Sequence, residues 1–231
     1  MTRLTIRNLL LAGVGVTALT AASAAFAADL PRRSLPPPRM PAYVPFFSWT
    51  GFYAGMNAGY GFGTSNWTDN LTGLSTGDFD INGALVGGTL GYNVQFGSAV
   101  FGLEADIDWS DMKGSTTTNC PGGCETKNTW LGTVRGRIGY AFDRFMPYVT
   151  GGGAFGQLQT DNPGIGGTTE TKFGWTLGGG LEYAFLSNWS AKIEYLYVDL
   201  GTMQCPNAAC IITADVTFKA NVVRGGLNYK F

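Results

Sequence analysis

The 231-residue sequence contains no histidine, and only 13% of its residues are charged. Histidine is the side chain that most often acts as a general base near neutral pH and that most often binds metals. From residue 46 onward, ten lysines and arginines face fifteen aspartates and glutamates, so the chain lacks the basic surface that nucleic-acid binding needs. These absences argue against a histidine-dependent enzyme and against a nucleic-acid partner.

Apolar runs long enough to cross a membrane as a helix are missing as well. The apolar run Leu9–Leu19 follows Arg3 and Arg7 and precedes the small-residue triplet Ala25–Ala27. This order of basic, apolar and small residues is typical of a secretory signal peptide, and the run is short for a membrane anchor, which is the alternative. We therefore expect residues 1–27 to be a signal peptide that is cleaved on export.

The next segment, residues 28–48, is rich in proline and carries three arginines, Arg32, Arg33 and Arg39. Such a composition favours extended polyproline-like conformers and contributes little to a core. We expect a solvated periplasmic tail; the alternative is that its arginines contact anionic headgroups or cell-wall polymer.

The last eleven residues alternate between two faces. Phe231, Tyr229 and Leu227 share one parity, whereas Lys230 and Arg224 share the other. Side chains of opposite parity lie on opposite faces of a β-strand, and the length matches a tilted strand that crosses a bilayer. The pattern predicts a membrane strand, with an edge strand of a soluble sheet as the alternative.

The same period-two alternation recurs in eight segments: 50–62, 82–96, 99–110, 129–142, 147–158, 172–185, 189–199 and 216–231. Three connections between them are short (97–98, 143–146 and 186–188), and four are long and polar (63–81, 111–128, 159–171 and 200–215). Short turns at one end and long loops at the other are typical of exported barrels. The sequence thus predicts an all-β fold, an eight-stranded antiparallel up-and-down transmembrane β-barrel over residues 49–231.

Aromatic residues support a barrel rather than a soluble sandwich, because they gather at strand ends and not in the middle. The turn-side set is Phe52, Tyr92, Phe96, Phe101, Tyr140, Phe142, Trp189, Tyr229 and Phe231, and the loop-side set is Tyr60, Trp109, Trp130, Phe173, Trp175, Tyr195 and Tyr197. Two such girdles match the two interfaces of a bilayer. We also expect Tyr148 to point outward, because it would continue the turn-side girdle.

The segments Ser48–Gly55, Asn57–Gly61 and Glu194–Tyr197, together with the terminal Phe231, resemble the opacity-type, porin-family outer-membrane proteins of alphaproteobacteria, which are relatives of the outer membrane protein A barrel. The resemblance implies an eight-stranded barrel in the Gram-negative outer membrane, with no catalytic residues and no cofactor. Tyr229 and Phe231 resemble the signal that the barrel assembly machinery reads. The implied partners are that machinery, outer-membrane lipid and lipopolysaccharide; the cell wall is a further candidate through the tail.

The inward parity carries nine charged side chains: Glu104, Asp106, Asp108, Arg135, Arg137, Glu182, Lys192, Glu194 and Arg224. An eight-stranded barrel is just wide enough for its own side chains, and isolated charges in so narrow a space would be costly. We expect a plug of ion pairs that joins Glu104 to Arg137, Asp106 to Arg135, and Glu194 to Arg224. The alternatives are a charged constriction that selects solutes and, for the row of acids from 104 to 108, a Ca²⁺ site.

The four cysteines form two close pairs, Cys120 with Cys124 and Cys205 with Cys210. Both pairs lie in predicted loops of an exported protein, where disulfides are expected. A four-cysteine zinc site is the alternative, but the spacings are not those of a usual zinc knuckle.

These observations favour a non-enzymatic structural barrel that supports envelope integrity and presents surface loops. A narrow porin for small polar solutes is the first alternative. Surface capture of a ligand such as haem or host matrix is the second, and it is implied only by relatives of the resembled proteins.

Overall fold

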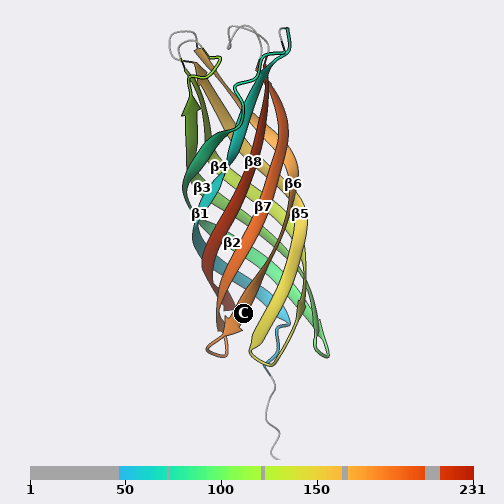
Figure 1. The fold of residues 1–231 in the computed structure, drawn as a ribbon. Coiled ribbons are helices and arrows are strands. Elements are labelled where there is room, and N and C mark those ends of the chain that lie inside the picture. Colours follow the sequence, from blue (N-terminus) through green and yellow to red (C-terminus); the bar gives the residue numbers. More distant parts are fainter. Residues whose placement is uncertain (1–46, 72, 121–122, 163–165, 206–213) are drawn as a thin grey trace, which may run out of the picture. The chain divides into compact units, whose positions relative to one another are not determined.

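The computed structural model describes residues 47–71, 73–120, 123–162, 166–205 and 214–231. The expected signal peptide and nearly all of the expected proline-rich tail lie outside these residues. Eight strands form a closed antiparallel barrel, in which each strand pairs with its sequence neighbours and the last pairs with the first (Figure 1). They are β1 (Gly51–Asp69), β2 (Phe79–Phe96), β3 (Ala99–Thr116), β4 (Cys124–Tyr140), β5 (Phe145–Asn162), β6 (Gly166–Ala184), β7 (Trp189–Cys205) and β8 (Ala214–Lys230). The predicted fold is confirmed. No helix in the described residues has the length and apolarity needed to span a membrane.

The strands are much longer than predicted. Each has 17 to 19 residues, whereas a tilted strand needs about 9–11 to cross a bilayer. The prediction of four long polar loops was therefore wrong, because most of each loop continues the adjoining strands. The connections at that end are only 70–78, 117–123, 163–165 and 206–213.

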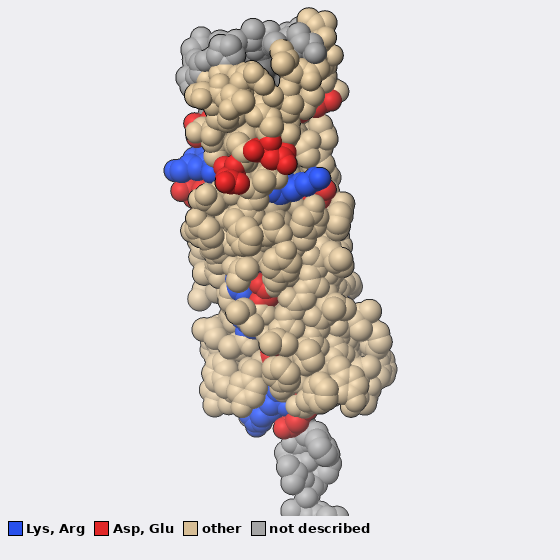
Figure 2. Space-filling view, viewed as in Figure 1, with Lys and Arg blue, Asp and Glu red and all other residues tan. Residues whose placement is uncertain are grey.

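The outer face changes character along the barrel. Large apolar side chains such as Met56, Leu103 and Trp109 are 69–79% exposed in the half near the short turns and at mid-height. Toward the loops the polarity reverses: Phe79 and Ile81 are buried, whereas Asp78 and Asp80, which alternate with them, are exposed. Figure 2 shows charged side chains gathered around the loop-side half, above a broad band in which few are visible. This is the surface of a barrel that leaves the bilayer and continues into water.

Tyr148 points inward, contrary to the prediction. It is 5% exposed, whereas its neighbour Val149 is 60% exposed and takes the outer face. The Tyr148 hydroxyl donates to Glu194 Oε1 (3.1 Å), and the Arg137 guanidinium lies 4.0 Å from the ring centroid. A cation over the ring face is attracted by the ring quadrupole, so the interior stabilises this tyrosine.

Two clusters of buried apolar residues lie toward the two ends of the barrel interior. The turn-side cluster comprises Trp49, Val100, Ala141, Met146, Tyr148 and Ala184. The loop-side cluster comprises Trp67, Phe79, Ile81, Leu85, Met112, Cys120, Cys124, Leu131, Ala154, Leu158, Leu196, Val198, Leu200, Met203, Val216, Phe218, Ala220 and Val222. A β-bulge between Asn128 and Trp130 reverses the parity of β4, so that both Asn128 and Leu131 face inward. Polar and charged side chains lie between the two clusters.

Candidate functional site: the barrel lumen

All nine charged residues predicted to face the lumen are inside the barrel, and none is more than 6% exposed. They come from five strands, β3, β4, β6, β7 and β8. Each has the inward parity of its strand, and the closed barrel brings the inner faces of the strands together. We refer to these nine residues as the lumenal ion network; they are Glu104, Asp106, Asp108, Arg135, Arg137, Glu182, Lys192, Glu194 and Arg224.

The register between β3 and β4 differs from the predicted one by two residues. Glu104 lies opposite Arg135, and Gly102 lies opposite Arg137. The expected contacts are nevertheless formed by side chains that reach along the strands, with Arg137 Nη1 at 3.4 Å from Glu104 and Arg135 Nη2 at 2.7 Å from Asp106. Arg135 also contacts Glu104 at 2.6 Å and reaches across the lumen to Glu194 at 2.8 Å. Each arginine therefore serves several carboxylates rather than one.

Arg224 of β8 connects carboxylates of β7 and β3 across the lumen. Its guanidinium contacts Glu194 (2.9 Å), as predicted, and also Asp106 (3.0 Å) and Asp108 (2.6 Å) on β3. The five carboxylates and four cations thus form one connected network instead of three separate pairs, because the lumen is narrow enough for opposite strands to share partners.

The remaining cations complete this network. Lys192 Nζ lies 2.8 Å from Glu104, and Arg137 lies 2.6 Å from Glu182. Glu182 also accepts hydrogen bonds from Ser190 and Asn228. Every carboxylate of the network therefore has at least one cation within 3 Å, which is the condition under which buried charges are tolerated.

Several polar atoms around the network have no hydrogen-bond partner among the described residues. They are Asn57 Oδ1, Asn93 Oδ1, Asp108 Oδ1, Arg137 Nε and Asn228 Oδ1. Buried polar atoms without a protein partner commonly bind isolated waters. These five atoms are therefore the positions in the lumen at which a water molecule could bind.

Tyr53 and Trp49 are parts of the interior that sequence reasoning did not identify as such. The Tyr53 hydroxyl donates to Glu104 Oε2 (2.8 Å) and accepts from Arg137 Nη1 (3.0 Å). Trp49 is 3% exposed in the turn-side mouth, where its indole N–H donates to the Asp143 carbonyl (3.0 Å) and its backbone N–H donates to Gln95 Oε1 (2.8 Å). The inward parity of Tyr53 was a usable signal, but Trp49 precedes β1 and follows no strand periodicity.

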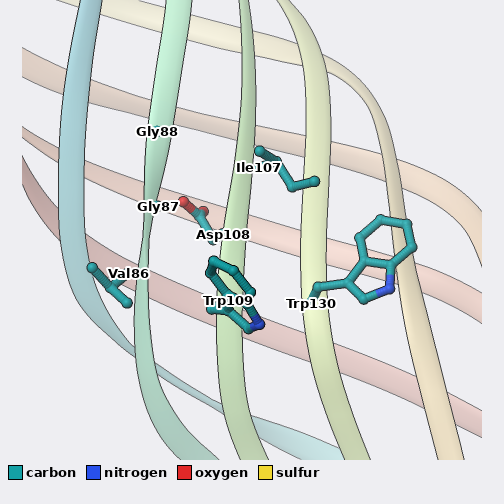
Figure 3. A pocket seen from close by; sticks show the side chains of 7 residues that line it. All are labelled: Val86, Gly87, Gly88, Ile107, Asp108, Trp109 and Trp130. Atoms are coloured by element: carbon teal, nitrogen blue, oxygen red, sulfur yellow. The ribbon is translucent and has the colours of Figure 1, made fainter.

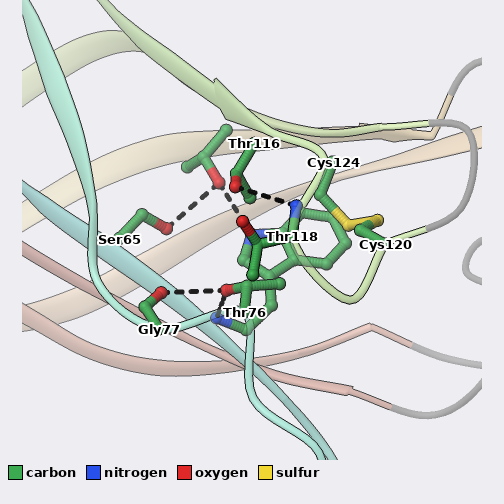
Figure 4. The surroundings of a disulfide bond; sticks show 9 residues. Ser65, Thr76, Gly77, Thr116, Thr118, Cys120 and Cys124 are labelled. Atoms are coloured by element: carbon green, nitrogen blue, oxygen red, sulfur yellow. Dashed lines mark hydrogen bonds between the residues drawn. A yellow bond between two sulfur atoms is a disulfide. The ribbon is translucent and has the colours of Figure 1, made fainter.

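The loop-side end of the described barrel contains an apolar cluster that includes a disulfide. The predicted Cys120–Cys124 disulfide is confirmed, and both cysteines are buried in the loop-side cluster (Figure 4). Beside it, Trp67 is 4% exposed and its indole N–H donates to Thr126 Oγ1 (2.9 Å). Cys210 of the second predicted pair lies outside the described residues.

Metal binding finds no support in the described part of the chain. No group of three or more cysteines, aspartates or glutamates there is arranged to hold a metal ion. The acids of the predicted Ca²⁺ alternative, Glu104, Asp106 and Asp108, each contact an arginine.

Comparison with known proteins adds the following. Residues 14–231 match the family described as outer membrane protein beta-barrel domain. The 31 kDa outer-membrane immunogenic protein of Brucella melitensis biotype 1 is 40% identical over 233 residues, covering 91% of this chain and 95% of that protein. The 25 kDa outer-membrane immunogenic protein of Brucella canis is 30% identical over 218 residues, covering 94% and 96%. Among solved structures, Neisserial surface protein A matches with a TM-score of 0.46 at 17% identity, covering 79% of this chain and 98% of that one.

Proposed function

Because this chain belongs to the outer membrane protein β-barrel family, we propose that it is a closed, non-conducting barrel that reinforces the outer membrane and presents its loop-side half at the cell surface. The chain is an outer-membrane protein of the Gram-negative type. The proposed role is to strengthen the envelope mechanically and to present surface loops. It is not a catalytic role. The carboxylates and cations of the lumenal ion network are bound to one another.

One observation supports this proposal: the buried side chains of the described residues form three successive layers inside the barrel. The turn-side cluster around Trp49 comes first, the lumenal ion network second, and the loop-side cluster around Phe218 and Met203 third. A permeating ion would have to displace buried apolar side chains twice and compete with short ion pairs in between. Such a passage is costly, because the ion loses its hydration and the packed side chains lose their contacts.

The proposed surface role is supported by the polarity of the loop-side half. Its outer face carries charge and its interior is apolar, which is the arrangement of a water-exposed β-barrel. The two Brucella relatives are named immunogenic, which fits proteins that have an accessible surface. We propose that the strands hold the loops clear of the membrane on a rigid support.

A narrow porin is the second candidate, and the unpartnered polar atoms favour it. Asn57 Oδ1, Asp108 Oδ1 and Arg137 Nε would be satisfied by a water column as well as by isolated waters. The two candidates predict different defects in a cell that lacks the protein. A reinforcing barrel protects against detergents, whereas a porin supplies small solutes.

A deletion strain distinguishes these roles. We expect it to become sensitive to bile-salt detergent while it takes up small sugars at the wild-type rate. The wild-type gene should restore detergent resistance. A normal response to detergent combined with slower sugar uptake would contradict the proposal and favour the porin.

A further inference from the structure

The lumenal ion network contains one more acid than it has bases. Its five acids bring five negative charges and its four bases bring four positive charges, which leaves one excess negative charge when every acid is ionised. All nine side chains are buried. A buried charge without a counter-charge is costly and is commonly neutralised by a proton. The charge balance therefore indicates that one acid is neutral, and the contacts of each acid show which one.

Asp108 is the one acid of the network that has an oxygen without a partner among the described residues. Its Oδ2 accepts from Arg224 Nη1 (2.6 Å), whereas its Oδ1 is buried and accepts no hydrogen bond from them. An ionised carboxylate is an acceptor at both oxygens, so the charge of Asp108 would be the least stabilised. The other four acids accept hydrogen bonds at both oxygens; they are Glu104, Asp106, Glu182 and Glu194.

The residues on either side of Asp108 bring no further positive charge to Oδ1. Figure 3 shows the Asp108 carboxyl beside Gly87 of β2, and a Cβ built on that glycine would collide with Oδ1. Gly87 pairs on its other side with Asn57 of β1, and the residue opposite Asp108 on β4 is Leu131. None of these three side chains titrates. The charged side chains that bind Asp108 or share its cation are Arg224 of β8, Asp106 of β3 and Glu194 of β7.

We propose that the lumenal ion network binds one proton, which Asp108 holds at a mildly acidic pH at which the other four acids are ionised. Asn57 Oδ1 has no partner among the described residues either, and a water molecule could donate to both oxygens, but it would leave the excess charge in place. A metal ion is disfavoured because the Arg224 guanidinium binds the same carboxyl. The barrel takes the proton from water when it folds, since an aspartate of the unfolded chain is ionised at this pH. The proposal is independent of the envelope role.

The first test detects the proton in the mature chain, refolded in micelles of a detergent that has no carbonyl group. At about pH 5.5 exposed carboxyls are ionised, so a protonated carboxyl is recognised by its carbonyl stretch in the infrared spectrum. We expect this band in the wild type and its loss in Asp108→Asn. Asp111→Asn is the matched control and should keep the band, because Asp111 lies on the same strand with a side chain that is 64% exposed. A wild type without the band, or Asp108→Asn with it, would overturn the proposal.

The second test uses the dependence of unfolding on pH. The chain has no histidine, so no ordinary side chain titrates between about pH 5 and pH 7. The folded barrel holds a proton that the unfolded chain lacks, and a rise in pH therefore favours unfolding. Between about pH 5 and pH 6 the folding equilibrium constant of the wild type should fall severalfold, up to the roughly tenfold that one proton allows. Asp108→Asn should show no such fall; a constant that does not change in the wild type would contradict the proposal.

Two substitutions of nearly equal shape separate Asp108 from its ionised neighbour Asp106. In Asp108→Asn the amide keeps an acceptor for Arg224 and places a donor where the proton was, so the guanidinium concentration at the unfolding midpoint should stay close to that of the wild type. Asp106→Asn should lower the midpoint clearly, because it removes a charge that binds both Arg135 and Arg224. Equal losses in the two variants would overturn the proposal. A wild-type midpoint that rises with sodium chloride and not with acid would overturn it in favour of a bound cation.

Discussion

Removal of Arg224 is the most informative perturbation of the lumenal ion network. Its side chain is 1% exposed and contacts Asp106, Asp108 and Glu194. In Arg224→Ala, Asp106 and Glu194 keep Arg135, but Asp108 loses the single cation that contacts it among the described residues. Removing one partner of a buried ion pair costs about 3–5 kcal/mol, so we expect the free energy of unfolding to fall by that amount.

The assay is equilibrium unfolding in guanidinium, followed by tryptophan fluorescence of the barrel refolded in micelles. Arg224→Lys should lose less stability than Arg224→Ala because it keeps the charge. It should not recover all of the stability, because one ammonium nitrogen replaces the three guanidinium nitrogens that contact Glu194, Asp108 and Asp106. Lys219→Ala, an exposed site on the same strand, should change stability by less than about 0.5 kcal/mol. A loss below about 1 kcal/mol for Arg224→Ala would show that the network is hydrated and screened, and it would refute the reasoning.

Three further predictions concern the two ends of the barrel. Trp49→Ala should lower the free energy of unfolding by about 3–5 kcal/mol, because it leaves a cavity in the turn-side mouth. Trp109→Ala, at a site that is 79% exposed, should lower it far less in the same denaturation assay. Equal losses for the two variants would contradict this. Cys120→Ser/Cys124→Ser should cost about 2 kcal/mol and make residues 117–123 sensitive to limited proteolysis, so an unchanged digestion pattern would count against a structural disulfide. Phe231→Ser should reduce the amount of protein in the outer membrane while the refolded barrel stays nearly as stable, since Phe231 is 76% exposed; wild-type membrane levels would disprove a role in assembly.

The membrane half of the barrel could be predicted from sequence because its alternation is simple. Apolar residues such as Leu103 and Ile107 face lipid, and Glu104 and Asp106 alternate with them toward the lumen. The loop-side half could not be predicted in the same way, because there the apolar residues face inward and the polar residues face water. The sequence around Phe79 therefore reads as a polar loop although it is strand.

Contacts across the lumen were harder to predict than the lumenal residues themselves. The β-bulge between Trp109 and Met112 shifts the register of β3 against β4, and no local pattern indicates where a bulge will form. Tyr148 was assigned to the wrong face because Gly151, Gly152 and Gly153 hide the parity of β5. Its inward position depends on Arg137 and Glu194, which come from other strands and are close only in the folded barrel.

Single-channel conductance of the refolded mature protein in a planar bilayer tests the central claim most directly. The three layers of buried side chains inside the barrel lead us to expect a silent bilayer for the wild type at physiological salt. Arg224→Ala should not open a steady channel either, because both apolar clusters remain in place. Reproducible open-channel steps from the wild type would contradict a closed barrel and identify the protein as a porin.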